Sequence, residues 1–151
     1  MRRALIVLFA LFLTLPAQAD QVPGTVTLPS SKSFAELADA LEAAVDAEGF
    51  FVVSRASASA GAAGRGIKIP GNLVVGVFRN DFAVRMLAAS VPAGIEAPLR
   101  FYITERADGT AALTYRIPTD AFAPYDGGDA LNRMAAELDV IWARIASTAV
   151  E

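Results

Sequence analysis

Six polar side chains in the second half of the chain have the chemistry of a binding site: Arg79, Asn80, Arg100, Tyr102, Arg116 and Tyr125. Arginine offers a planar fork of N–H donors that fits a carboxylate or a phosphate, and asparagine and tyrosine add further hydrogen-bonding groups. The chain contains no His and no Cys. Imidazole bases, thiolate nucleophiles and ordinary zinc, iron-sulfur or histidine-ligated haem sites are therefore excluded, and we expect no cofactor and no metal.

A hairpin is expected to position two of these arginines. Residues 99–106 and 110–117 alternate apolar and polar side chains as strands do, around a turn at 107–109. A three-residue turn with Gly109 in the left-handed region aligns the apolar residues of both strands on one face, whereas a two-residue turn would mix apolar and charged positions. We therefore predict the three-residue turn.

This register places Arg100 opposite Arg116 on the polar face of the hairpin, with Tyr102 beside them. Like charges that face each other across two strands are unfavourable. The two guanidinium groups either splay into water or share an anion, such as a ligand carboxylate or phosphate. The sequence leaves both interpretations open.

Arg79 and Asn80 stand at a predicted corner between a strand and a helix. Residues 73–78 form a nearly continuous apolar run typical of a central strand, and a helix capped by Asn80 or Asp81 is expected to follow. The free amides and dipole of a helix N-terminus favour anions, and Arg79 would add donors beside them. Because Asp81 already brings negative charge to this end, simple capping is the competing interpretation.

Tyr125 lies in a predicted loop, residues 119–128, together with Phe122. Such a loop either closes over a pocket or is only pinned to the core by its two aromatic side chains. Both interpretations remain open at this stage.

The strongest helix signal spans residues 33–48. Ser33 and Glu36 form a capping box, Gly49 marks the stop, and apolar residues recur on one face with helical spacing. The outward face carries only acidic side chains, with no basic partner in the helix: Glu36, Asp39, Glu42 and Asp46. They indicate either a docking surface for a cationic partner or a solvated surface that keeps the protein soluble.

The remaining segments complete an α+β order. Residues 21–28 and 50–54 are predicted as strands, and residues 129–148 as a last helix capped by Asp129. The stretch 55–66, rich in Ser, Ala and Gly, is predicted as a flexible connector, and 91–98 as an irregular connection. The predicted order is β-α-β-β-α-β-β-α, an antiparallel-rich sheet with helices packed on it.

The N-terminus has the features of a secretory signal peptide. Arg2 and Arg3 precede an apolar run at residues 4–15, and small residues follow up to Ala19. This run is shorter than the roughly 20 residues that span a bilayer. We therefore expect removal of residues 1–19 by cleavage after Ala19, no stable membrane anchor, and a periplasmic or secreted single domain of residues 20–151.

Cleavage would remove two of the 13 basic residues and none of the 16 acidic ones, which leaves a net charge of −5. An acidic exported domain is a poor candidate for binding nucleic acid or anionic lipid. The partners that remain are a small anionic ligand or another protein of the cell envelope.

A set of motifs along residues 20–151 resembles a known family. The motifs are Gly49-Phe50, Arg79-Asn80-Asp81 after an apolar strand, the stretch 93–100, and Asp108-Gly109 followed by Tyr115 and Pro118. Together they are similar to the bacterial family called domain of unknown function 302, which usually has Gly-Asn-Pro where this chain has Arg79-Asn80-Asp81. The resemblance implies an α+β fold, often seen as a homodimer, and transfers no catalytic residues.

Three functions are compatible with this reasoning. The main hypothesis is a non-catalytic binding module for a small anionic ligand or a protein partner, with the six polar side chains as its site. One alternative is a carboxylate-based enzyme with Glu96 and Glu105 as acid and base and Arg100 as an electrostatic clamp, although strand alternation turns Glu105 away from Arg100. The other is a purely structural dimerisation domain.

Overall fold

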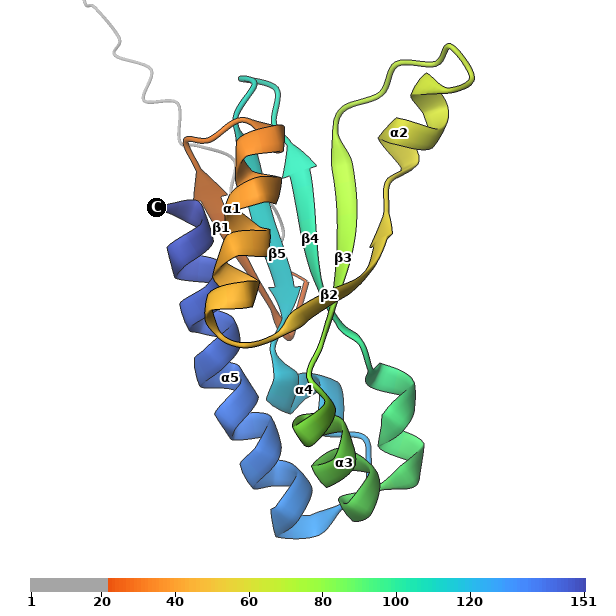
Figure 1. The fold of residues 1–151 in the computed structure, drawn as a ribbon, viewed down its shortest axis with the longest axis vertical. Coiled ribbons are helices and arrows are strands. Elements are labelled where there is room, and N and C mark those ends of the chain that lie inside the picture. Colours follow the sequence, from red (N-terminus) through yellow and green to blue (C-terminus); the bar gives the residue numbers. More distant parts are fainter. Residues whose placement is uncertain (1–21) are drawn as a thin grey trace, which may run out of the picture.

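The alternating segments of the sequence assemble into one five-stranded antiparallel sheet (Figure 1). The structure is a computed structural model that describes residues 22–151. Its strands, in the spatial order β1-β5-β4-β3-β2, are β1 (Thr25–Ser30), β2 (Phe51–Ala56), β3 (Asn72–Phe78), β4 (Leu99–Glu105) and β5 (Ala111–Arg116). Its helices are α1 (Phe34–Ala47), α2 (Ala58–Ala63), α3 (Asn80–Ala89), α4 (Pro118–Phe122) and α5 (Gly128–Val150), with the 3-10 helix η1 (Val91–Glu96). The predicted α+β class is confirmed.

One face of the sheet is covered by helices and the other is not. Helices α1 and α5 pack beside each other on the covered face (Figure 1), where strand side chains such as Val75, Phe101 and Leu113 are fully buried. Alternate strand residues point the other way, and among them Tyr102 is 41% exposed. We call this second surface the open face, because no helix of residues 22–151 packs on it.

The hairpin between β4 and β5 has the predicted three-residue turn. Gly109 has a φ of +83°, a left-handed value that favours glycine, and the amide of Arg106 donates to the carbonyl of Thr110 over 2.7 Å. Phe101 lies opposite Tyr115, so both strands direct their apolar residues to the covered face. This register is confirmed.

Helix α1 forms where its end signals and its apolar spacing coincide. The Ser33 hydroxyl accepts from the amide of Glu36 over 3.4 Å, and the amide of Ser33 donates to the Glu36 carboxylate over 2.8 Å. The predicted capping box is therefore present. The residues that the helix buries recur at helical spacing: Leu37, Ala38, Leu41, Ala44 and Val45.

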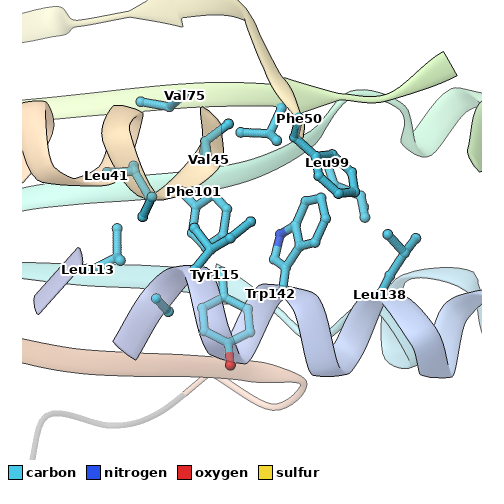
Figure 2. Close-up of a cluster of buried hydrophobic side chains, with 14 of the residues drawn as sticks. Leu41, Val45, Phe50, Val75, Leu99, Phe101, Leu113, Tyr115, Leu138 and Trp142 are labelled. Carbon is cyan, nitrogen blue, oxygen red and sulfur yellow. The ribbon is translucent and has the colours of Figure 1, made fainter. Parts of the chain in front are cut away.

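The centre of the core is an aromatic cluster around Trp142 of α5 (Figure 2). The Trp142 ring stacks on Phe101 at 5.5 Å between centroids and meets Phe50 edge-on at 5.3 Å. Only 1% of Trp142 is exposed, and its Nε1 has no hydrogen-bond partner among the described residues. A buried donor without a partner costs about 1–3 kcal/mol, so apolar packing must offset this cost.

The end of the molecule below the sheet in Figure 1 is more helical than the sequence indicates. The irregular connection predicted at 91–98 is largely the 3-10 helix η1, and the loop predicted at 119–128 begins with α4. The amide and hydroxyl of Thr119 both donate to the carboxylate of Asp139 on α5, over 2.9 and 2.8 Å. These bonds join residues 20 positions apart, so the spacing of residues along the chain does not reveal them.

Helix α5 starts at Gly128 without a side-chain cap, and the predicted cap at Asp129 is wrong.

The stretch 55–66, predicted as a flexible connector, instead completes β2 and contains α2. Ser57 caps α2 by accepting from the amide of Ala60 over 3.1 Å, and the alanines that follow favour a helix. None of the α2 residues is buried. Residues 57–71 therefore project from the sheet edge as an arm (Figure 1).

The sequence of α1 offers no basic partner for its acidic outward face, but the fold brings one close. The Glu42 carboxylate forms an ion pair with Arg55 of β2, a neighbour that only the fold brings close. The Glu36 carboxylate is engaged in the capping box. No ion pair is found for Asp39 or Asp46 within residues 22–151.

The predicted signal peptide, residues 1–19, lies outside the described residues. Within the described part of the chain, none of the helices has the length and apolar character needed to cross a membrane.

Replacing Trp142 by alanine is expected to destabilise the fold by about 3–5 kcal/mol, because the loss of a buried aromatic side chain leaves a cavity. Urea unfolding followed by circular dichroism would show a lower midpoint. The matched control is Val140→Ala on the same helix, where the side chain is 60% exposed and the expected change is within about 0.5 kcal/mol. Equal stability of the two variants would contradict the central place of Trp142.

Candidate functional site

Two arginines of the predicted site lie in one row across the open face. The register pairs Thr25 with Arg116 and Gly76 with Arg100. Continuing the pairing of Phe101 with Tyr115 by one residue sets Arg100 opposite Arg116. The next row carries hydroxyl groups beside them, on Thr27, Thr114 and Tyr102. The polar face of the hairpin is therefore arranged as the sequence predicts.

These arginines have few partners in the described chain. Both side chains are exposed, and neither forms an ion pair with a carboxylate of residues 22–151. Arg116 donates from Nη2 to the carbonyl of Asp120 over 3.4 Å, which is a long hydrogen bond. The hydroxyls of Thr27 and Thr114 hydrogen-bond each other over 2.9 Å. The guanidinium donors of this row are largely available.

Tyr125 lies near Arg116 and is paired with Glu96. Its hydroxyl donates to the Glu96 carboxylate over 2.6 Å, which links the loop after α4 to the end of η1. This hydrogen bond is the main reason why the pKa of Tyr125 is raised, and the positive charge of Arg116 acts in the opposite direction. The sequence pointed to Tyr125 and Glu96 separately, but a separation of 29 positions gives no signal that they meet.

Arg79 is not part of this row. Val77 is buried on the covered face, and Arg79 follows it two positions later on the same side. Its guanidinium carbon lies 4.5 Å from the ring centroids of both Phe50 and Phe82. The structure therefore separates Arg79 from Arg100 and Arg116 by the thickness of the sheet.

The donors of Arg79 are taken up within the protein. Nη1 donates to the carbonyl of Glu48 over 3.1 Å, and Nε and Nη2 donate to the Asp81 carboxylate over 2.8 and 3.1 Å. These bonds hold the pKa of Asp81 below its usual value. Asn80 is exposed and begins α3, whereas the residue at the cap position is Arg79, without a side-chain cap. The predicted cap at Asn80 or Asp81 is wrong, because Arg79 engages the Asp81 carboxylate.

The two carboxylates of the enzymatic alternative lie at opposite ends of β4. Glu96 precedes the strand and Glu105 is its last residue. A strand of seven residues spans about 20 Å, far beyond the roughly 10 Å over which two carboxyl groups act on one bond. Glu105 instead accepts from the amide of Gly71 over 2.6 Å. Within residues 22–151, no cluster of three acidic side chains is arranged to hold a metal ion.

The fold and this surface define a class: an α+β domain with an antiparallel sheet that the helices of residues 22–151 cover on one side. The chain belongs to the family described as domain of unknown function DUF302, whose model matches residues 26–148. The comparison with curated proteins finds no match.

One solved structure shows the same fold. It is the crystal structure of an uncharacterized conserved protein DUF302 from Bacillus stearothermophilus, which has a TM-score of 0.74 and 20% sequence identity to this chain. The likeness covers 86% of this chain and 100% of that one. The homodimer that the resemblance implies concerns a second chain and stays a prediction.

We expect Tyr125 to lose its proton only above about pH 10, the usual value for tyrosine, because ionisation would break its bond to Glu96 and place two negative charges together. The stabilisation from this raised pKa is complete below pH 10 and is lost as the pH rises through the folded-state value. The difference in phenolate absorbance between the protein and Tyr125→Phe isolates this titration.

Glu96→Gln keeps an oxygen acceptor but removes the charge, so it is expected to lower the pKa of Tyr125. Tyr115 is the internal control, because burial is the main cause of its raised pKa. If Tyr125 titrates identically in the unmodified protein and in Glu96→Gln, the pairing of Tyr125 with Glu96 is contradicted.

Proposed function

We propose that the protein is an exported, non-catalytic binding module whose open face takes a partner protein through carboxylate groups on that partner. The observation that supports this most is the row formed by Arg100 and Arg116, exposed and without carboxylate partners in residues 22–151. Two guanidinium groups side by side repel each other unless an anion lies between them. A carboxylate from a partner would supply that anion.

The shape of the open face favours a protein over a small ligand. Small molecules usually bind in clefts of about 300–1,000 Å³ that enclose most of their surface. Of the clefts of about 370–550 Å³ in residues 22–151, one reaches Tyr102 on the open face, but neither arginine lines any of them. The neighbouring hydroxyls of Thr27, Thr114 and Tyr102 would add hydrogen bonds across a broad contact.

The residue types and their placement also support a role without catalysis. The chain has no His and no Cys, and Glu96 and Glu105 lie at opposite ends of β4. Glu96 is hydrogen-bonded to Tyr125, beside the arginine row. There it would limit how much negative charge the site accepts, which favours a partner with separated carboxylates over a dense anion such as phosphate.

Export is expected to produce a mature chain that starts at Asp20. Expression of the full chain in a Gram-negative host, followed by intact-mass measurement of the periplasmic fraction, tests this directly. Replacing both Ala17 and Ala19 by lysine removes the small residues that signal peptidase requires and should block cleavage. Recovery of the unmodified chain uncleaved in the cytoplasm would contradict the proposed export.

The double variant Arg100→Ala, Arg116→Ala is expected to bind a glutamate-rich probe peptide at least about tenfold more weakly, because each charge-assisted hydrogen bond contributes about 1.5–3 kcal/mol. Fluorescence anisotropy of the labelled peptide at constant ionic strength measures the affinity. The binding should weaken as salt is added.

The matched control is the double variant Arg65→Ala, Arg133→Ala, which removes the same charge from other surfaces, and its affinity should stay close to that of the unmodified protein. If both double variants lost the same affinity for the peptide, the net charge of the protein would explain the binding, and the proposed site would be contradicted. Citrate in place of the peptide tests the remaining possibility: binding of citrate but not of the peptide, lost in Arg100→Ala, Arg116→Ala, would assign the row to a small anion.

A further inference from the structure

A concave surface lies on the covered side of the sheet, between α1 and the arm. It is a cleft of about 500 Å³, within the range of small-molecule sites. The main residues that line it come from α1, β2, α2 and β3: Phe34, Ala38, Asp39, Arg55, Ala60 and Leu73. It shares no residue with the arginine row.

The floor of the cleft is apolar. Leu73 and Ala38 are each 6% exposed, and the half-buried Phe34 packs against the core beside them. Phe34 also packs against the arm at Gly71, where an added Cβ would lie only 2.8 Å from the phenyl ring. Glycine at this position therefore lets the ring close one end of the cleft.

The arm that forms the far wall is held in place by polar contacts. The amide of Ala58 donates to Asn72 Oδ1 over 2.9 Å, and the amide of Asn72 donates to Ser59 Oγ over 3.1 Å. The amide of Gly71 donates to the Glu105 carboxylate over 2.6 Å. Although α2 buries no residue, these bonds attach both ends of the arm to the sheet, so the cleft is formed before any ligand binds.

The cleft is lined by one carboxylate, Asp39, and one guanidinium group, Arg55. Arg55 on its wall is neutralised by its ion pair with Glu42. Asp39 is exposed on the rim and has no ion-pair partner within residues 22–151. A single available carboxylate above an apolar floor matches a ligand with a cationic group on an apolar body.

We propose that the cleft between α1 and the arm binds a small organic cation, an amine with an aromatic or aliphatic body. The apolar body lies on Phe34, Ala38 and Leu73, and the ammonium group pairs with Asp39. Neither part of this arrangement depends on the arginine row or on the function proposed for it.

The test titrates the protein with phenethylamine, hexylamine and the uncharged isostere 2-phenylethanol, and follows backbone amide shifts by NMR. We expect shifts at Ala38, Ala60 and Leu73, and a tighter dissociation constant for phenethylamine than for 2-phenylethanol. Asp39→Asn should weaken phenethylamine about three- to tenfold and leave 2-phenylethanol unchanged. The matched control is Asp46→Asn, which removes the same charge from the same helix outside the cleft and should change neither.

Ala60→Phe fills the cleft from an exposed position on α2 and should abolish binding of all three probes while the remaining spectrum shows an intact fold. The proposal is overturned if neither amine shifts the cleft amides, if Asp39→Asn and Asp46→Asn have equal effects, or if the amines bind Ala60→Phe as well as the unmodified protein. Each of these results would leave the partner proposed for the open face untouched.

Discussion

The packing of Trp142 between Phe50 and Phe101 is the contact on which the rest of the structure depends. It joins the long helix α5 to the start of β2 and to the central strand β4 in one buried cluster. Aromatic burial of this extent contributes several kcal/mol. The ion pair of Arg144 with Glu48 joins α5 to the end of α1 at the surface, but an exposed pair contributes about 0–1 kcal/mol.

Because α1 and α5 pack against each other on one side of the sheet, the opposite side has no helix of residues 22–151 packed on it. Strand residues alternate in direction, so every residue between two core positions faces outward. Here those residues include two arginines and several hydroxyls. Arg79 differs from these arginines, because its guanidinium group lies against the rings of Phe50 and Phe82 and its donors are used within the protein.

The arm is held by polar contacts, whereas the rest of the chain is held by its apolar core. Hydrogen bonds hold it in place: the amide of Asn72 donates to Ser59 and the amide of Gly71 donates to Glu105, while α2 has no buried side chain. Segments that do not contribute to a core are usually more mobile unless polar contacts restrain them. Here the polar contacts hold the arm in place, and the arm forms a cleft with α1. The core does not depend on this cleft.

Some features could be predicted from the sequence because they depend on neighbours along the chain. The capping box at Ser33 and Glu36 involves residues three apart, and the turn at Gly109 sets the register of its own hairpin. From that register alone, Arg100 and Arg116 had to share a face, because the side-chain period of a strand is two.

Other features were decided only by the tertiary structure. The bond from Tyr125 to Glu96, the pair of Glu42 with Arg55 and the bonds from Thr119 to Asp139 all join separate elements. The spacing of residues along the chain does not relate such partners, because each pairing depends on how the helices and strands pack on the common core. The sequence correctly predicted that Arg100 and Arg116 share one face, because this depends on the hairpin alone. It could not show that Arg79 lies against the rings of Phe50 and Phe82, because these residues belong to separate parts of the fold.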